Sequence, residues 1–129
     1  MRFMMMVMGN DDYQAGKPPS PALMAAIEKL SIEARAAGKL LSSEGLKPGA
    51  IRIRLRNGKR SMVDGPFAET KEVIGGYAIF ELASKEEALV YAQRFVDAHV
   101  EAGVKNFEME IRPMFGPEDF ACSREAPRG

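Results

Sequence analysis

The chain has 129 residues, of which 46% are hydrophobic and 28% charged. That size and composition are typical of one folded domain and too apolar for a disordered chain. Eighteen basic residues balance eighteen acidic ones. Because proteins that bind duplexes carry a basic surplus that neutralises phosphates, we expect no direct nucleic-acid binding. A single cysteine, Cys122, and a single histidine, His99, exclude an internal disulfide framework and leave too few ligands for a zinc site, so we expect no metal or cofactor.

The first eight residues are mostly apolar, yet they do not predict a leader. The run ends at Gly9, which is short for the apolar part of a signal peptide, and no small-residue cleavage site follows. No stretch approaches the ~20 apolar residues that span a bilayer. We expect a cytoplasmic protein without membrane contact.

Residues 2–8 are apolar on both alternating faces, which predicts a central strand covered on both sides. A loop rich in Gly, Asn, Asp and Pro follows at 9–19. Ser20 is a good N-cap and Pro21 is tolerated at the first helical position, so a helix begins here and ends before Gly38. The apolar stripe of this helix consists of Leu23, Ile27, Leu30 and Ala34.

The middle of the chain predicts a short strand at 39–46 and then a hairpin. Residues 51–56 alternate strictly, with aliphatic side chains on one face and arginines on the other. The pair Asn57-Gly58 is a strong signal for a two-residue turn, leading to a return strand at 60–63.

The last third predicts strand, helix and strand. Residues 75–82 are largely apolar on both faces and indicate a second central strand. Ser84 and Glu87 form a capping box that opens a helix ending near Gly103. The apolar side of this helix carries Leu89, Ala92, Phe95, Val96 and His99. A strand at 107–112 follows, and we place the domain at 1–120 and a C-terminal tail at 121–129.

This order of elements predicts an α+β fold of the ferredoxin-like type, two βαβ units with an extra β-hairpin. Two helices can cover only one face of such a sheet, whereas both central strands are apolar on both faces. We therefore expect a homodimer, of the dimeric α/β-barrel type, in which a second copy covers the open face.

Residues 64–72 read DGPFAETKE, and with Gly75-Gly76-Tyr77 and residues 110–115 this string resembles the DGPF-motif branch of the YCII-related proteins. The resemblance covers essentially residues 1–120. It implies the ferredoxin-like fold and dimeric association, with some members associated with alternative sigma factors and others thought to be small-molecule enzymes. It also implies a histidine in the first helix paired with an aspartate. Residues 20–37 contain no histidine, so that pair is not carried over and only Asp64 remains.

The candidate site is a cleft beside the DGPF turn. Asp64 is its catalytic candidate, as a general acid or base, with Phe67 as an apolar wall, Lys71 beside it and Arg112 as an anion partner. A structural interpretation stays open, because Asp side chains satisfy turn amides and Gly before Pro favours an extended exit. Burial would raise the pKa of Asp64, whereas Lys71 would lower it.

Three functions remain open at this point: a small-molecule binder or cofactor-independent enzyme, an interaction protein linked to transcription, and a dimeric scaffold. The stripe of Arg52, Arg54 and Arg56 could grip an anion or simply line a polar face. His99 is interpreted as a packed histidine rather than a proton shuttle, and Cys122 as an inert thiol.

Overall fold

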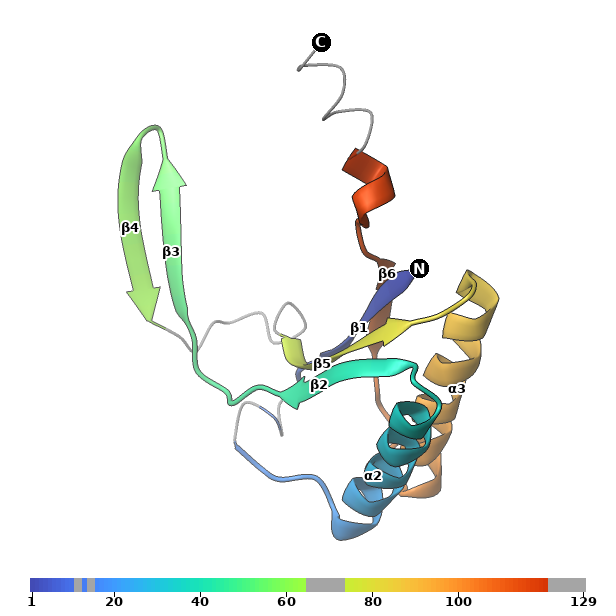
Figure 1. Ribbon diagram of the computed structural model, residues 1–129. Helices are drawn as coiled ribbons and strands as arrows, with labels where there is room; N and C mark the ends of the chain where they lie inside the picture. The colour runs from blue at the N-terminus through green and yellow to red at the C-terminus, as the bar shows by residue number, and fades with distance from the viewer. Residues whose placement is uncertain (11–12, 14–15, 65–73, 121–129) are drawn as a thin grey trace.

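The fold is a mixed α+β arrangement on one antiparallel sheet (Figure 1). The computed structural model describes the chain except residues 11–12, 14–15, 65–73 and 121–129. The main sheet has the order β2-β5-β1-β6, with β1 at Arg2–Met8, β2 at Leu40–Gly45, β5 at Ile74–Glu81 and β6 at Met109–Pro113. Helices α2 (Pro21–Ala36) and α3 (Lys85–Glu101) pack together on one face of it. A separate two-stranded sheet consists of β3 (Ile51–Arg56) and β4 (Lys59–Asp64).

The predicted order of elements is confirmed, and so are the two central strands. β1 lies between β5 and β6 and is antiparallel to both, with Phe3 opposite Phe80 and Met5 opposite Ala78. One predicted boundary is wrong. The last strand begins at Met109 rather than Phe107, because the Phe107 ring turns onto α3 instead of pairing with β1.

Helix α2 begins and ends where the sequence predicts. The Ser20 hydroxyl accepts a hydrogen bond from the backbone N–H of Leu23 at 3.2 Å, which satisfies one of the orphan donors of the first turn. Gly38 follows the helix with a φ of 72°, the left-handed conformation that glycine adopts without a steric penalty.

Helix α3 begins with the predicted capping interactions. The Ser84 hydroxyl accepts from the Glu87 backbone N–H at 3.1 Å. The Glu87 carboxylate in turn accepts from the Ala83 backbone N–H at 2.9 Å, one residue before the cap. Two unpaired amides are thus satisfied at a helix start that also carries acidic side chains, which the helix dipole favours.

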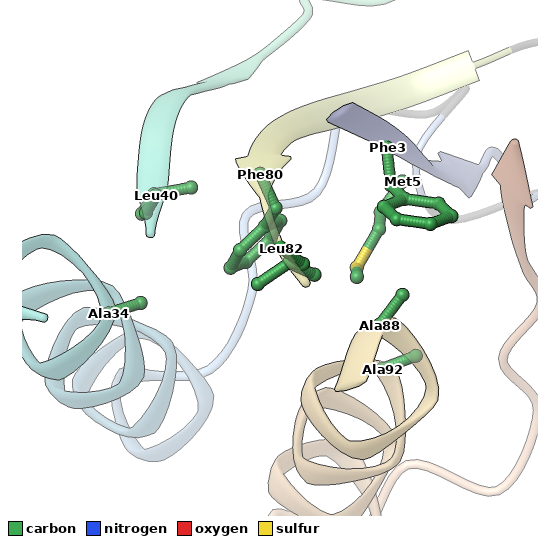
Figure 2. Packing of buried hydrophobic residues seen from close by; sticks show 8 residues of the cluster. All are labelled: Phe3, Met5, Ala34, Leu40, Phe80, Leu82, Ala88 and Ala92. Atoms are coloured by element: carbon green, nitrogen blue, oxygen red, sulfur yellow. The ribbon is translucent and has the colours of Figure 1, made fainter. Parts of the chain in front are cut away.

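The hydrophobic core lies between the sheet and the two helices (Figure 2). Phe3 and Met5 on β1 and Phe80 on β5 project toward the helices, where α3 presents small residues. Ala88 on α3 has no exposed surface, so the helix backbone approaches the sheet closely. Burial of each large side chain contributes roughly 1.5–3 kcal/mol. The core is completed by Ala34, Leu40, Leu82 and Ala92. The prediction for Leu89 is wrong, since this residue is 43% exposed.

The opposite face of the main sheet carries no helix or strand among the described residues (Figure 1). We call it the open face. Directly paired residues of neighbouring strands share a face, so one row across the sheet runs Glu44, Tyr77, Met6, Glu110, and the next runs Ser42, Ile79, Met4, Arg112. Both rows are apolar at their centre and polar at their edges.

The hairpin of β3 and β4 turns at Asn57 and Gly58, as predicted. Their φ values of 50° and 76° are both positive, the condition for a type I′ turn that matches strand twist. The two strands pair only with each other among the described strands, and Figure 1 shows the hairpin standing away from the main sheet.

Candidate functional site

A cleft of about 1240 Å³ opens at the end of the main sheet where β1 ends and α2 begins. Alternating strand directions bring the start of β5 and the end of α3 to the same end. The cleft therefore draws its walls from segments far apart in the sequence, as ligand sites commonly do.

The walls of the cleft are largely apolar. Side chains from both helices, from the connection to β6 and from the first residue of β6 contribute this surface: Leu23, Ile27, Phe95, Phe107 and Met109. Polar groups come mainly from loops and the strand ends, including Asn10, Lys17, Ser43, Glu44 and Lys105. An apolar cleft with few polar groups is typical of a site for small organic molecules.

His99 is the buried polar residue of this cleft. It is 7% exposed, and its Nδ1 lies 2.9 Å from the backbone oxygen of Phe95, one helical turn earlier. Nδ1 therefore carries the proton and donates to this carbonyl, which in the neutral ring leaves Nε2 as an acceptor.

The second ring nitrogen of His99, Nε2, belongs to a residue that lines the cleft. Within the part of the chain that the structure describes, no fully buried side-chain nitrogen or oxygen lacks a hydrogen-bond partner. Since the bond to Phe95 occupies Nδ1 and the residue lines the cleft, Nε2 is the nitrogen left for a bound molecule.

Aromatic rings hold the imidazole of His99 in place. The Phe107 ring stacks on it with centroids 3.9 Å apart and an interplanar angle of 27°. The Phe95 ring packs against the imidazole in a tilted orientation, with the two ring centroids 4.8 Å apart. Gly103, with a φ of 85°, ends α3 and lets the chain turn back so that Phe107 reaches the helix. The imidazole therefore has a defined orientation at the cleft wall.

Tyr13 lies over the start of β5 and lines the same cleft. Its backbone N–H donates to the side-chain oxygen of Asn10 at 2.8 Å. A Cβ on Gly75 would lie 3.3 Å from the Tyr13 ring, so glycine allows the close approach. Burial raises the pKa of Tyr13 above its usual 10.0, and the hydroxyl stays a donor at neutral pH.

The predicted site residues fall in three places. Asp64 is the last residue of β4, where its backbone pairs with Ile51. Phe67 and Lys71 lie outside the described residues. Arg112 lies in β6 opposite Met4, exposed on the open face, and does not line the cleft. Asp64 and Arg112 thus belong to different sheets, and the carboxylate site stays a prediction.

Two comparisons with known proteins identify the relatives of this chain. The model of the YCII-related domain matches residues 1–114. The chain is 34% identical over 93 residues to the protein named "Uncharacterized protein R00369" of Rhizobium meliloti (strain 1021), covering 70% of this chain and 69% of the relative. The chain belongs to the YCII-related family.

The YCII-related match covers β1 to β6, including every described strand and both helices that build the cleft. Sequence reasoning placed His99 on an apolar helix face but did not find the cleft beside it. The available signal was the pair of Gly103 and Phe107, a helix stop followed by an aromatic residue that can fold back on the last turn.

The YCII-related chain shows two further properties within its described residues. No group of three or more His, Cys, Asp or Glu side chains there could hold a metal ion. None of the described helices combines the length and apolar character that a membrane crossing requires.

Proposed function

We propose that this YCII-related protein binds a small organic molecule in the cleft, with Nε2 of His99 receiving its hydrogen-bond donor. The observation that carries the proposal is the buried imidazole with Nδ1 committed to Phe95. A buried polar atom is costly unless it is paired, so a buried imidazole whose Nδ1 is committed to Phe95 favours a ligand that pairs with Nε2.

The walls favour a particular kind of ligand. Apolar side chains on both helices favour a hydrophobic body, while Tyr13 and Ser43 offer hydroxyl groups to its polar end. We infer an uncharged or weakly acidic molecule with an apolar body and an O–H or N–H group. If the protein is an enzyme, His99 acts as a general base on that proton, since Nε2 is an acceptor in the neutral ring.

Asp64 enters the proposal through its sequence neighbourhood. Gly75 and Gly76 line the cleft, and the DGPF string begins eleven residues before Gly75. We propose that Asp64 is a second acid or base near the cleft mouth, with Phe67 and Lys71 beside it. Arg112 is left out because it faces the open side of the sheet.

We also place the protein in the DGPF branch of its family and in the ferredoxin-like class. The string at 64–67 supports the branch. The antiparallel order β2-β5-β1-β6 with two helices on one face supports the class. A cytoplasmic location is part of the same proposal.

A homodimer completes the proposal. Met4 and Ile79 are half-buried apolar residues on the open face, which no described element covers. A second copy placed by a two-fold axis would cover it, as in a dimeric α/β barrel. Light scattering at micromolar concentration should give twice the chain mass, and a monomer at every concentration would refute the dimer.

A ligand screen tests the cleft. Thermal shift with a library of small organic acids, alcohols and amides should find compounds that stabilise the wild type, by about 2.7 kcal/mol at a hundred times Kd. His99→Phe keeps an aromatic ring between Phe95 and Phe107 but removes Nε2, so it should lose the stabilisation. Arg112→Gln, on the open face, is the matched control and should keep it. A hit that stabilises His99→Phe as strongly as the wild type would contradict the site.

The same hits test Asp64 separately. Asp64→Asn should weaken binding if the DGPF segment borders the cleft. If the response to ligand is unchanged in Asp64→Asn but lost in His99→Phe, the cleft stands and the role of Asp64 is refuted.

A further inference from the structure

The floor of the cleft is the helix-facing side of the main sheet. Directly paired residues of neighbouring strands share a face. Two such rows line the cleft, one with Gly45, Gly76 and Val7 and the next with Ser43, Ala78 and Met5. Met5 belongs to the core between the sheet and the helices, so both rows face the helices rather than the open face.

The part of this floor that lies on β2 and β5 is flat. Its residues have no side chain or a very short one: Gly45, Gly76, Ser43 and Ala78. A Cβ placed on Gly45 would meet no atom within 4 Å, so the space above this residue is open. Glycine inside a strand often marks a place where a ligand approaches the backbone closely.

Bulky apolar side chains border the flat strip. Met5 and Val7 adjoin it on β1, and Leu23 and Ile27 of α2 line the same cleft. Leu23 is buried and Ile27 is half-buried. Dispersion attraction requires atoms at contact distance. A planar ring places all of its atoms at that distance from a flat floor, whereas a puckered saturated ring places only some of them there.

The charged side chains of the cleft are exposed to solvent. Among the described residues, the acidic and basic side chains that line it are those of Lys17, Glu44, Lys105 and Glu108, and all four are exposed. An ionised group between the apolar walls would lose its hydration without a buried carboxylate or ammonium group to pair with it. The cleft therefore favours a ligand that is uncharged when bound.

We propose that the cleft binds a planar aromatic compound of one or two rings that carries a hydroxyl group. The inference rests on the proposed function and names the ligand class of that site. The ring lies on the flat strip around Gly45 and Gly76, and the hydroxyl donates a hydrogen bond to Nε2 of His99.

Size and protonation fit this ligand class. Alternate residues of a strand are roughly 6.8 Å apart and neighbouring strands ~4.8 Å, so the four small residues outline an area the size of a one- or two-ring system. A phenolic hydroxyl with a pKa of about 10, as in tyrosine, is uncharged at neutral pH. It is also a stronger hydrogen-bond donor than the hydroxyl of an aliphatic alcohol.

Fluorescence titration with naphthol tests the ligand class. The chain has no tryptophan, so naphthol excited beyond the absorption of tyrosine reports on the ligand alone, and the wild type should give a saturable change. Decahydronaphthol keeps the hydroxyl and the two-ring skeleton but is saturated and puckered. In competition with naphthol it should bind at least about tenfold more weakly.

A second comparison tests the hydroxyl. Methoxynaphthalene keeps the planar rings but has no O–H donor, so it should bind the wild type about tenfold more weakly than naphthol. His99→Phe removes the acceptor. In this variant the two compounds should bind with Kd values within about threefold of each other.

A variant that fills the flat strip tests where the ring lies. Gly45 does not have a positive φ, and a β-branched residue suits a strand, so Gly45→Val adds a side chain above the floor without backbone strain. It should weaken naphthol binding at least about tenfold. Ser42→Val, on the opposite face of the same strand, is the matched control and should keep Kd within about threefold of the wild type. Thermal unfolding checks that both variants are folded.

The outcomes separate the ligand class from the site. If decahydronaphthol binds as tightly as naphthol, or if Gly45→Val binds naphthol like the wild type, the planar ligand is refuted. Equal binding of naphthol and methoxynaphthalene by the wild type refutes the hydroxyl. If naphthol does not bind, but other compounds stabilise the wild type and not His99→Phe, the ligand class is refuted and the proposed function stands. If no compound of either set binds, both are refuted.

Discussion

Nζ of Lys39 lies 2.5 Å from Oε2 of Glu87, so a residue that follows α2 is bonded to the first turn of α3. The hydrogen bond from Lys39 lowers the pKa of Glu87, and a second one from the Ala83 backbone N–H adds to this effect. The same bond raises the pKa of Lys39. One ion pair therefore joins the two βα halves of the domain beside the start of β2.

Glu87→Gln should lower stability in a pH-dependent way. Because folding lowers the pKa of Glu87, its ionised carboxylate stabilises the fold at pH values above its usual pKa of 4.5. This stabilisation is lost as pH falls through the pKa of Glu87 in the folded protein. Because folding raises the pKa of Lys39, its charged ammonium group stabilises the fold at pH values below its usual pKa of 10.5. This stabilisation is lost as pH rises through the raised pKa of the folded protein. The urea midpoints of wild type and variant should therefore differ most between these values and converge as pH falls through the lowered pKa of Glu87. Glu86→Gln, exposed in the same turn, is the control, and a difference that is constant with pH would contradict the ion pair.

Ser84→Ala should destabilise the domain by about 0.5–2 kcal/mol, because it removes the acceptor of the Glu87 backbone N–H at the start of α3. Urea unfolding at neutral pH measures the change. Ser84→Asp should recover most of the loss, since aspartate is also a good N-cap, whereas equal losses in both variants would show that the cap hydrogen bond is not the cause.

Ala88→Leu should cost about 1–3 kcal/mol, because the residue has no exposed surface where α3 meets the sheet and the extra carbons must displace core side chains. Val90→Leu on the same helix changes a side chain that is 58% exposed and should change stability by less than about 0.5 kcal/mol. Thermal unfolding of the two variants compares them directly, and similar melting temperatures would contradict the close packing of α3.

Gly58→Ala should loosen the β3–β4 hairpin, which we call the arm, without affecting the main sheet. The φ of 76° at Gly58 is left-handed, and a Cβ there costs about 1–2 kcal/mol. Hydrogen exchange followed by mass spectrometry should show faster exchange in β3 and β4 and unchanged exchange in β1 and β5. Asn57→Gly is tolerated in the same turn type and should leave the arm largely protected. Faster exchange throughout the domain would show that arm and sheet unfold together.

Most of the fold follows from local patterns in the sequence. The caps at Ser20 and Ser84, the turn at Asn57-Gly58 and the doubly apolar strands each depend on residues close together in the chain, so the pattern alone predicts them. The alternation of residues 51–56 also shows which side chains share a face. The alternation does not show which face of the hairpin is covered, because that depends on how the hairpin is oriented relative to the rest of the protein.

The cleft depends on contacts that local patterns do not encode. His99 was expected to be a packed histidine, and its burial agrees with that interpretation. The orientation of the His99 ring is set by Phe107, which returns to the helix after the turn at Gly103. The role of Asp64 depends on a segment outside the described residues, so the sequence remains its only support.

The chain leaves the main sheet at the end of β2 and returns to it at the start of β5, and these two points are hydrogen-bonded neighbours. Gly45 pairs with Gly76, and the backbone N–H of Leu46 donates to the oxygen of Gly75 at 2.9 Å. The chain therefore leaves and rejoins at hydrogen-bonded neighbours, and a short turn could replace residues 47–73 without breaking a strand of the main sheet. The β3–β4 hairpin and the cleft are in this sense separable modules, and such a shortened chain should fold and keep the pocket around His99.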